Sequence, residues 1–472
     1  MQREKYLMKN LILFALGSVG TKLISFFLIP LYTNILTTSE YGTADFAFTI
    51  CTILVPIITF NMAESVMRFS LDKGADRNQI ISVGYVFCII CILLGSIAIP
   101  VSGIFKTVEN YSLYIFLYSV TYGINQILIS NLRGKEKVLQ YSISNILHTF
   151  CIAVFNILFL VVMETGIDGY FIANIISNVV TIIYSAVVGE LKGSVKNFSL
   201  NKILMKKMVK YSSAMIPDCL MWWVINSSDR IMVTAMEGAD ANGIYAISYK
   251  IPSLLSTFAV IFNQAWSYSA IREDESADRE EYNNKIYDKM VKTLFLCTSG
   301  LLMIIKPLLS VYVHEDYYSA WKYTPFLFMA FMFTTLGMFV AASYTVNKDG
   351  KGFLVAAVLS AGTNVVLNFI LIPVMGVTGA AVATLISYFV RFVFVTINTR
   401  KYIHIKVLQK KHIMGYIVLA FMCASVFLEG IVGQLILIAE FGIMVVLMKD
   451  YIIEAFGLVK KILVDKLGKK SA

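Results

Sequence analysis

Charged side chains inside long apolar stretches are the residues of this sequence that could do chemistry. An ionisable group at the centre of a bilayer costs about 2.5 to 3.5 kcal/mol, so it faces a partner or a water-filled cavity. The candidates are Lys22, Asp218, Asp229, Arg230, Lys250 and Arg391. Cations placed in this way suit the path of an anionic substrate, and a buried acid suits the binding of a coupling proton or cation.

Lys22 is the strongest single candidate, because it lies near the middle of the first apolar stretch. Roughly twelve helical residues at about 1.5 Å each place it about 18 Å from the start of that stretch. Its ammonium group either lines a central cavity for an anionic substrate or pairs with a carboxylate on a neighbouring helix. We favour the cavity, because the sequence offers few buried acids as partners.

The seventh apolar stretch, "MIPDCLMWWVINSSDRIMV", carries three of these charges. Asp218 follows Pro217, and a proline inside a helix frees a backbone carbonyl and kinks the chain, which suits a gate or an ion site. Asp218 therefore either binds a coupling ion or pairs with Lys22. Asp229 and Arg230 are adjacent and point in different directions, which argues against a mutual ion pair. They either close an outer gate or extend to the membrane surface.

The remaining candidates are weaker. Lys250 precedes a proline in the eighth stretch and is a possible phosphate ligand, whereas Arg391 either lines the pathway or extends to the interface. Asn61 and Asn263 occupy equivalent places in a repeat and more often bond across helices than bind substrate. No pattern indicates a catalytic or metal site, since the sequence has no phosphate-binding loop or HExxH motif. We expect no cofactor beyond a coupling ion, H+ or Na+.

The elements that must position these residues are transmembrane helices. Of the 472 residues, 58% are hydrophobic and 15% are charged, and the mean hydropathy is +0.72. A spanning helix needs about 20 apolar residues. Fourteen stretches qualify, although twelve spans are also defensible: 10–32, 41–66, 80–104, 110–131, 139–163, 169–189, 211–236, 242–269, 293–313, 320–345, 353–373, 375–398, 412–428 and 430–448.

The distribution of basic residues predicts the orientation. Of the 40 Lys and Arg residues, 33 fall in the tails and in alternate connections that include both termini, and three fall in the opposite connections. Cytoplasmic loops carry the positive excess, so we expect both termini in the cytoplasm. Basic loops beside anionic headgroups also explain the net charge of +10 without nucleic acid as a partner.

Two pairs of similar segments indicate an internal duplication. "FNMAES" at 60–65 is repeated as "FNQAWS" at 262–267, and "GIDGYFIANIIS" at 166–177 as "GVTGAAVATLIS" at 376–387. Each unit has six spans, so both run in the same direction and predict two parallel bundles with a cavity between them. The expected domains are a lobe at 1–190, a basic linker at 191–210, a second lobe at 211–400, and two further helices with a tail at 401–472.

Residues 14–42, 216–255 and 364–387 together resemble bacterial polysaccharide flippases of the multidrug, oligosaccharidyl-lipid and polysaccharide exporter superfamily. The resemblance implies translocation of an undecaprenyl-diphosphate-linked oligosaccharide across the bacterial cytoplasmic membrane by alternating access, for cell-surface polysaccharide synthesis. It implies Lys22, Lys250, Arg230 and Arg391 as cations for the diphosphate and Asp218 as the coupling acid. Expected partners are the lipid-linked oligosaccharide, membrane lipids and the polymerase of the pathway.

Two other functions stay open from the sequence. A cation-coupled exporter of small drugs from the same superfamily would not need several cavity cations. A membrane glycosyltransferase or a scaffold of the same pathway is the alternative from a different class. We expect a carrier and not an enzyme, because the outer connections are short and a soluble catalytic domain is absent from the sequence.

Overall fold

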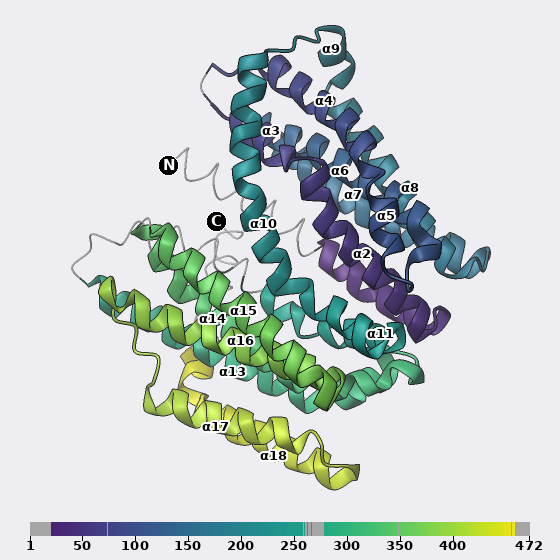
Figure 1. The fold of residues 1–472 in the computed structure, drawn as a ribbon. Coiled ribbons are helices and arrows are strands. Elements are labelled where there is room, and N and C mark those ends of the chain that lie inside the picture. Colours follow the sequence, from purple (N-terminus) through teal and green to yellow (C-terminus); the bar gives the residue numbers. More distant parts are fainter. Residues whose placement is uncertain are drawn as a thin grey trace, which may run out of the picture. The chain divides into compact units, whose positions relative to one another are not determined.

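The computed structural model describes residues 20–72, 74–257, 259, 262, 266, 278–347, 349–454 and 456–457, without the side chains of 214, 218, 221, 222, 225, 226 and 345. All regular elements in this part of the chain are helices (Figure 1). The first helix is described over residues 20–35. The following elements, in chain order, are α2 (Thr38–Ile58), α3 (Met62–Ser70), α4 (Arg77–Gly95), α5 (Ala98–Gly103), η1 (Glu109–Tyr111), α6 (Ser112–Gly134), α7 (Val138–Asn156), η2 (Ile157–Val162), α8 (Gly166–Val188), α9 (Leu191–Lys196), α10 (Lys202–Glu237), α11 (Ala239–Lys250), α13 (Arg279–Tyr312), η3 (Glu315–Lys322), α14 (Thr324–Val346), α15 (Gly350–Met375), α16 (Val377–Asn398), η4 (Thr399–Lys401), α17 (Lys410–Ser425) and α18 (Gly430–Leu447).

Ten helices of the described residues are long and apolar enough to cross a membrane. They match ten of the expected spans, and the all-α membrane class is confirmed. Of the other four, 10–32 and 242–269 include residues outside the described part of the chain. Residues 211–236 belong to the 36-residue α10, and α17, with 16 residues, is shorter than a complete span.

The described chain forms two compact units. Unit 1 contains the residues up to Ile247 together with Tyr312–Tyr317, and unit 2 contains Ser248–Val311 and the residues from Tyr318 onward. In unit 1, α6 packs against α2, α3, α4 and α8, so it is the central helix. In unit 2, α16 packs against both α14 and α15.

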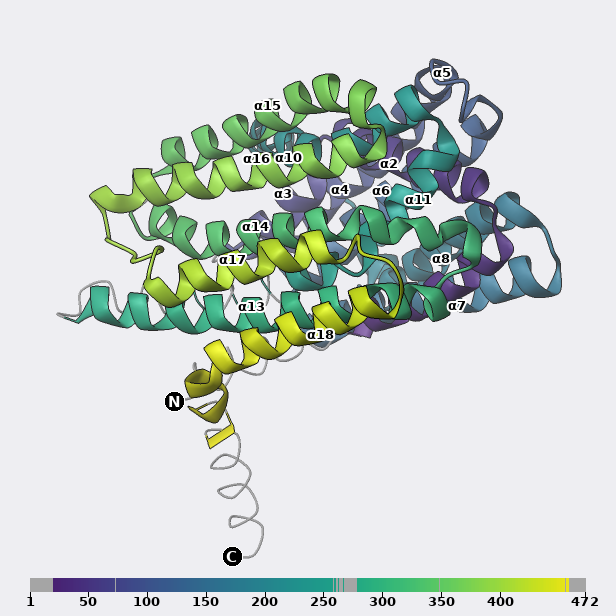
Figure 2. The ribbon, with the colours of Figure 1, turned by 90° about the horizontal axis from the view of Figure 1, so that it is seen from below.

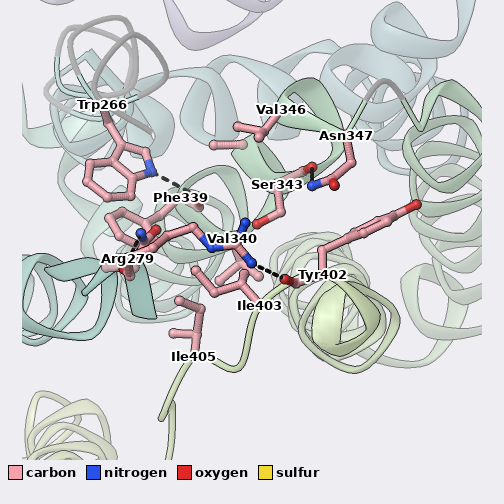
Figure 3. Close-up of a pocket in the computed structure, with 12 residues that line it drawn as sticks. Trp266, Arg279, Phe339, Val340, Ser343, Val346, Asn347, Tyr402, Ile403 and Ile405 are labelled. Atoms are coloured by element: carbon pink, nitrogen blue, oxygen red, sulfur yellow. Dashed lines mark hydrogen bonds between the residues drawn. The ribbon is translucent and has the colours of Figure 1, made fainter. Parts of the chain in front are cut away.

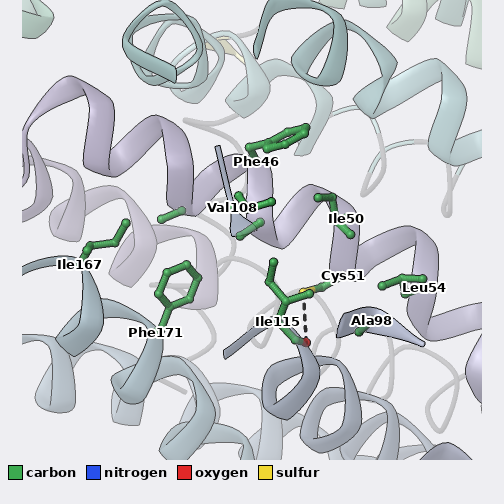
Figure 4. Close-up of a cluster of buried hydrophobic side chains, with 11 residues drawn as sticks. Phe46, Ile50, Cys51, Leu54, Ala98, Val108, Ile115, Ile167 and Phe171 are labelled. Atoms are coloured by element: carbon green, nitrogen blue, oxygen red, sulfur yellow. Dashed lines mark hydrogen bonds between the residues drawn. The ribbon is translucent and has the colours of Figure 1, made fainter. Parts of the chain in front are cut away.

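The core of unit 1 is apolar and joins helices that are distant in sequence. Phe46, Ile50 and Leu54 of α2 meet Ile115 of α6 and Phe171 of α8 (Figure 4). All five side chains are at most 6% exposed. Burying residues of this size contributes about 1.5 to 3 kcal/mol each in water, whereas inside a bilayer close packing supplies the gain. This cluster holds α2 in place beside the cavity described below.

The apolar stretch 41–66, expected as one helix, is broken. Pro56 lies inside α2, and Phe60 and Asn61, both with φ of 50°, separate α2 from α3. A left-handed backbone costs of order 1 to 3 kcal/mol at a residue other than glycine, although asparagine tolerates it better than most. Backbone bonds from Phe60 N to Ile57 O and from Asn61 N to Pro56 O close the end of α2. The chain can therefore turn without leaving these carbonyls unpaired.

In unit 2, α17 and α18 run alongside α13 (Figure 2). Gln434 of α18 donates to the carbonyl oxygen of Met303, and His412 of α17 contacts the Asp288 carboxylate at 2.9 Å. The mixed-charge residues from Arg279 to Lys292 belong to the same helix as the ninth apolar stretch, because α13 begins at Arg279 and extends unbroken to Tyr312.

Candidate functional site

Unit 1 contains a cavity of about 500 Å³ beside the break between α2 and α3. Its wall is built from α2, α3, α6, α7 and α10. Thr52, Val55, Pro56, Thr59, Asn61, Ala63, Glu64, Tyr122, Gln126, Ile129, Ser130, Arg133, Tyr141, Cys219, Trp223, Ser227 and Arg230 line it. We call it the unit 1 cavity. Ligand pockets commonly have volumes of about 300 to 1,000 Å³, so this cavity can hold a small organic group.

The wall combines charge, amide groups and aromatic rings. Arg133, Arg230 and Glu64 supply charges, Gln126 and Asn61 supply amides, and the rings come from Tyr122, Tyr141 and Trp223. The Trp223 indole N–H donates to the Thr52 hydroxyl at 3.0 Å, which fixes the ring against α2. A lining of this composition suits a polar, anionic ligand that also has flat apolar faces, against which the aromatic rings can pack.

Arg133, in the last turn of α6, is a cation at the wall of the cavity. Its guanidinium lies 5.3 Å from the ring centroid of Tyr141. Among the described residues it has no acidic partner. Its neighbours differ, because Lys135 donates to the Gly189 carbonyl and Lys137 pairs with Glu190, each at 2.8 Å or less. Arg133 can therefore receive a phosphate or a carboxylate, which its planar fork binds with two hydrogen bonds.

Arg230 joins α10 to the beginning of α2. Its guanidinium forms an ion pair of 2.8 Å with Asp45, whose side chain is 10% exposed. The adjacent Asp229 is 2% exposed and accepts a hydrogen bond of 2.8 Å from the Tyr245 hydroxyl. Arg230 thus contacts α2 and Asp229 contacts α11. Adjacent residues on one helix point in different directions, so this difference is expected.

The first turns of α2 and α11 touch at two glycines. Gly42 and Gly243 hold corresponding places in the two sequence repeats. A Cβ atom on Gly42 would lie 1.8 Å from the Ala239 carbonyl oxygen, and one on Gly243 would lie 2.1 Å from the Thr38 carbonyl oxygen. Both contacts are shorter than any real Cβ contact, so this crossing requires glycine on each helix.

Hydrogen bonds surround the contact between Gly42 and Gly243. The Thr38 hydroxyl donates to the Asp240 carboxylate at 2.7 Å, and the Asn242 amide donates to the Gly42 carbonyl at 2.9 Å. Tyr317 donates to the carbonyls of Leu36 and Thr37 just before α2. We call the residues Thr38, Gly42, Asp45, Arg230, Asp240, Asn242 and Gly243 the α2–α11 contact.

The predicted site residues are divided among several places. Arg230 and Asn61 line the unit 1 cavity. Lys22 is exposed on the first helix, Lys250 is half-buried at the end of α11, and Arg391 is half-buried on α16; none of these three lines that cavity. Asn263 and the side chain of Asp218 lie outside the described residues. The roles assigned to these residues from the sequence stay predictions.

Sequence reasoning passed over several residues of the cavity wall and also Asp45, the ion-pair partner of Arg230. Asp45 and Glu64 stand inside the apolar stretch 41–66, so the search for charges inside apolar stretches that identified Lys22 could have identified them. Arg133 stands in the same short basic run as Lys135 and Lys137, after the fourth apolar stretch, and no feature of the sequence separates it from them. Tyr122 and Trp223 belong to stretches rich in aromatic residues, where no pattern shows which ring faces a cavity.

A second cavity, in unit 2, is much smaller. Its volume is about 20 Å³, and its walls include Trp266, Arg279, Phe339 and Tyr402 (Figure 3). The guanidinium of Arg279 donates to the Tyr402 carbonyl oxygen at 2.8 Å. This space holds about one water molecule. It is a packing gap at the start of α13 and has no room for a sugar.

One charge cluster outside the spans fixes the end of the α14–α15 connection. Asp349 precedes α15, accepts from the backbone N–H of Gly352 at 2.9 Å, and pairs with Lys401 at 2.8 Å. The Lys401 ammonium, with the Gly352 N–H and the Tyr402 hydroxyl, lowers the pKa of Asp349 to about 2. The cluster ties α15 to the segment after α16.

The described helices define a class of protein, a multi-pass α-helical membrane protein, and solved structures share its fold. A lipid II flippase MurJ in an inward closed conformation is 15% identical, with a TM-score of 0.64 over 93% of this chain and 100% of that chain. An inward-facing multidrug resistance MATE family transporter of the MOP superfamily is 13% identical, with a TM-score of 0.59 over 85% and 98%. At these identities the likeness concerns the fold.

The sequence comparisons are more specific. The family model described as polysaccharide biosynthesis protein matches residues 7–268, which is more than half of the chain. A probable lipid II flippase MurJ of Thermotoga maritima is 28% identical over 164 residues, a match that spans 32% of this chain and 33% of that relative. The chain belongs to the polysaccharide biosynthesis protein family.

Proposed function

We propose that this protein is a flippase, which carries an undecaprenyl-diphosphate-linked oligosaccharide from the inner to the outer leaflet of the bacterial cytoplasmic membrane by alternating access. The observation that carries the proposal is the unit 1 cavity, a space of about 500 Å³ with Arg133 at its wall and aromatic and amide side chains around it. The family, which is named for polysaccharide biosynthesis, supports this substrate class.

The cavity wall suits the polar part of such a lipid. The diphosphate needs a cation, and Arg133 has no acidic partner among the described residues, so its guanidinium is available for a bidentate contact. The sugar needs hydrogen-bonding groups and flat apolar faces, which Gln126, Tyr122 and Trp223 supply. The polyprenyl tail stays in the bilayer, since it is as apolar as the lipid.

The α2–α11 contact is the proposed outer gate. In the orientation predicted from the basic residues, the beginnings of α2 and α11 lie on the outer side and the end of α6 with Arg133 lies on the inner side. In this proposal, the contact keeps the outer side closed until it separates. Release of the sugar requires that the Thr38–Asp240 bond and the Asp45–Arg230 ion pair separate.

The same proposal covers location and partners. A flippase of this class works in the cytoplasmic membrane with both termini in the cytoplasm, and the translocated lipid passes to a polysaccharide polymerase. The coupling ion is H+ or Na+, and the protein performs no catalysis of its own. The glycan that is carried, whether of lipopolysaccharide, capsule or exopolysaccharide type, follows from the gene's pathway.

The test is the leaflet location of the undecaprenyl-diphosphate-linked repeat unit in cells. We expect cells without the protein to accumulate this lipid on the cytoplasmic side, and wild type to restore the outer-leaflet pool. Arg133→Ala should restore it poorly at matched protein level, whereas Lys137→Ala should restore it fully, because Lys137 pairs with the exposed Glu190 outside the cavity. An unchanged distribution in the deletion strain would overturn the proposal.

A second candidate is a cation-coupled exporter of small drugs. The fold shared with a MATE family transporter favours it. Exporters of cationic drugs need an acid in the cavity, and Glu64 is such an acid. Deletion should then increase drug sensitivity without trapping any lipid-linked sugar, and Glu64→Gln should reproduce the deletion.

A further inference from the structure

The last apolar helix, α18, contains one charged residue, Glu440. It lies ten residues after Gly430 and seven before Leu447. At about 1.5 Å per residue these distances are roughly 15 and 10 Å, so the carboxyl group sits near the middle of a membrane-spanning helix. A charge at this depth is costly, and such residues are usually functional.

The carboxyl group of Glu440 faces the neighbouring helix. Leu437 and Met444, one turn before and after it, are 3% and 0% exposed, which marks this side of α18 as the packed one. Oε1 of Glu440 lies 2.9 Å from the hydroxyl of Ser425 at the end of α17. Oε2 is buried and has no hydrogen-bond partner within the described residues.

The groups around Glu440 provide no positive charge in the described part of the chain. On α17 the nearby titratable group is Cys423, whose thiol donates to the Pro325 carbonyl, and Tyr416 lies farther along that helix. On α13 the charged candidate is Lys306, whose ammonium donates to the Leu428 carbonyl at 2.9 Å and covers the Trp321 ring at 4.1 Å. No lysine or arginine there bonds to Glu440.

A protonated carboxyl group fits this arrangement better than a carboxylate. Its hydroxyl, formed at Oε1, would donate to the Ser425 oxygen. Oε2 would then be a neutral carbonyl oxygen, and an unsatisfied carbonyl is a much smaller cost than an unpaired buried charge. A carboxylate would instead leave a full negative charge with a single hydroxyl donor.

We propose that Glu440 is a proton-binding site of this protein, occupied in the described conformation and emptied when the α17–α18 pair exposes it to water during the cycle. The ligand is a proton taken from water onto Oε1 and returned to water, and no other bond changes. The link to transport rests on the proposed flippase function. The site is built from α17 and α18 of unit 2.

Carbodiimide labelling tests whether the proton is present. Dicyclohexylcarbodiimide partitions into the membrane and reacts with protonated carboxyl groups, whereas a water-soluble carbodiimide reaches acids at the surface. We expect mass spectrometry of the full-length protein at pH 7 to find Glu440 modified by the first reagent and Glu429, just before α18, by the second. Absence of Glu440 modification by the membrane-soluble reagent would overturn the proposal.

Transport by the purified protein in liposomes tests the use of that proton. An imposed proton gradient should accelerate lipid movement by wild type and by Glu429→Gln. Glu440→Gln mimics the permanently protonated group, so the acceleration by the gradient should be at least tenfold smaller in this variant. Its lipid movement without a gradient should persist. An equal response in Glu440→Gln would refute the coupling. If wild type moves no lipid-linked sugar at all, the flippase proposal fails, and the labelling result alone decides whether Glu440 holds a proton.

Discussion

At the scale of single residues, function depends on which charges have partners. Arg230 is neutralised by Asp45, and Lys137 by Glu190, whereas Arg133 faces the unit 1 cavity beside the Tyr141 ring and has no acidic partner among the described residues. A substrate anion at Arg133 therefore displaces no carboxylate of the described residues. This difference makes Arg133 the residue where a substitution should affect binding most and folding least.

Arg133→Ala should lower transport about tenfold or more, because loss of a charge-assisted bidentate contact removes roughly 1.5 to 3 kcal/mol of binding. Arg133→Lys should retain part of the activity, since the ammonium keeps the charge and loses the fork. Initial rates of lipid movement in liposomes, over a range of substrate concentrations, measure both variants. Wild-type rates in Arg133→Ala would show that the cavity cation is not used.

Gly42→Ala tests the close approach of α2 to α11. The new methyl group would lie 1.8 Å from the Ala239 carbonyl oxygen, so the helices must separate. Overpacking of this kind costs roughly 1 to 3 kcal/mol, and we expect a lower Tm in detergent together with reduced transport. The matched control is Gly362→Ala on α15, where a Cβ atom has open space. Equal Tm values for the two variants would contradict the close packing of α2 on α11.

At the scale of helices, the proposed outer gate is the α2–α11 contact. Thr38→Cys combined with Asp240→Cys, in a background without the seven native cysteines, places two thiols where a 2.7 Å hydrogen bond stands now. We expect oxidation to form a disulfide and stop transport, and a reductant to restore it. Each single-cysteine variant is the control. Full transport by the oxidised double variant would rule out a gate at this contact.

The Asp349 cluster gives a prediction for pH. Because the folded pKa, about 2, is below the ordinary value of 3.8, the charged form stabilises the fold above the ordinary value and that gain is lost as the pH falls toward 2. Asp349→Asn retains a helix cap and removes the charge. We therefore expect wild type to resist unfolding better than Asp349→Asn at pH 6, with the difference shrinking between about pH 4 and pH 2. A difference that stays constant over that interval would contradict the assignment.

Helix positions were predictable from the sequence to within a few residues, as α6, α8 and α16 illustrate, because an apolar run of fixed length is a strong signal. The break at Phe60 and Asn61 was not, since apolar character continues through it and the left-handed turn is set by packing. Gly42 and Gly243 hold corresponding places in the repeat. Their contact depends on how two distant helices cross, and no local pattern encodes that crossing.

At the scale of the whole molecule, the sequence established the class through composition and the family through three stretches of resemblance, and the family is confirmed. Which charges meet was harder to predict, because the pairs Arg230–Asp45 and Thr38–Asp240 join residues separated by 185 and 202 positions. Those contacts support the three proposed roles. In this proposal, the cavity in unit 1 holds the polar head group, the α2–α11 contact is the outer gate, and Glu440 in unit 2 carries the proton.

The measurement that tests the central claim most directly uses the purified full-length protein in liposomes with undecaprenyl-diphosphate-linked sugar confined to one leaflet. A membrane-impermeant enzyme that consumes only exposed sugar reports arrival in the other leaflet. We predict protein-dependent arrival that fails in Arg133→Ala and persists in Lys137→Ala. No arrival above protein-free liposomes, together with proton-driven efflux of a cationic dye by the same preparation, would contradict the flippase account and favour the drug exporter.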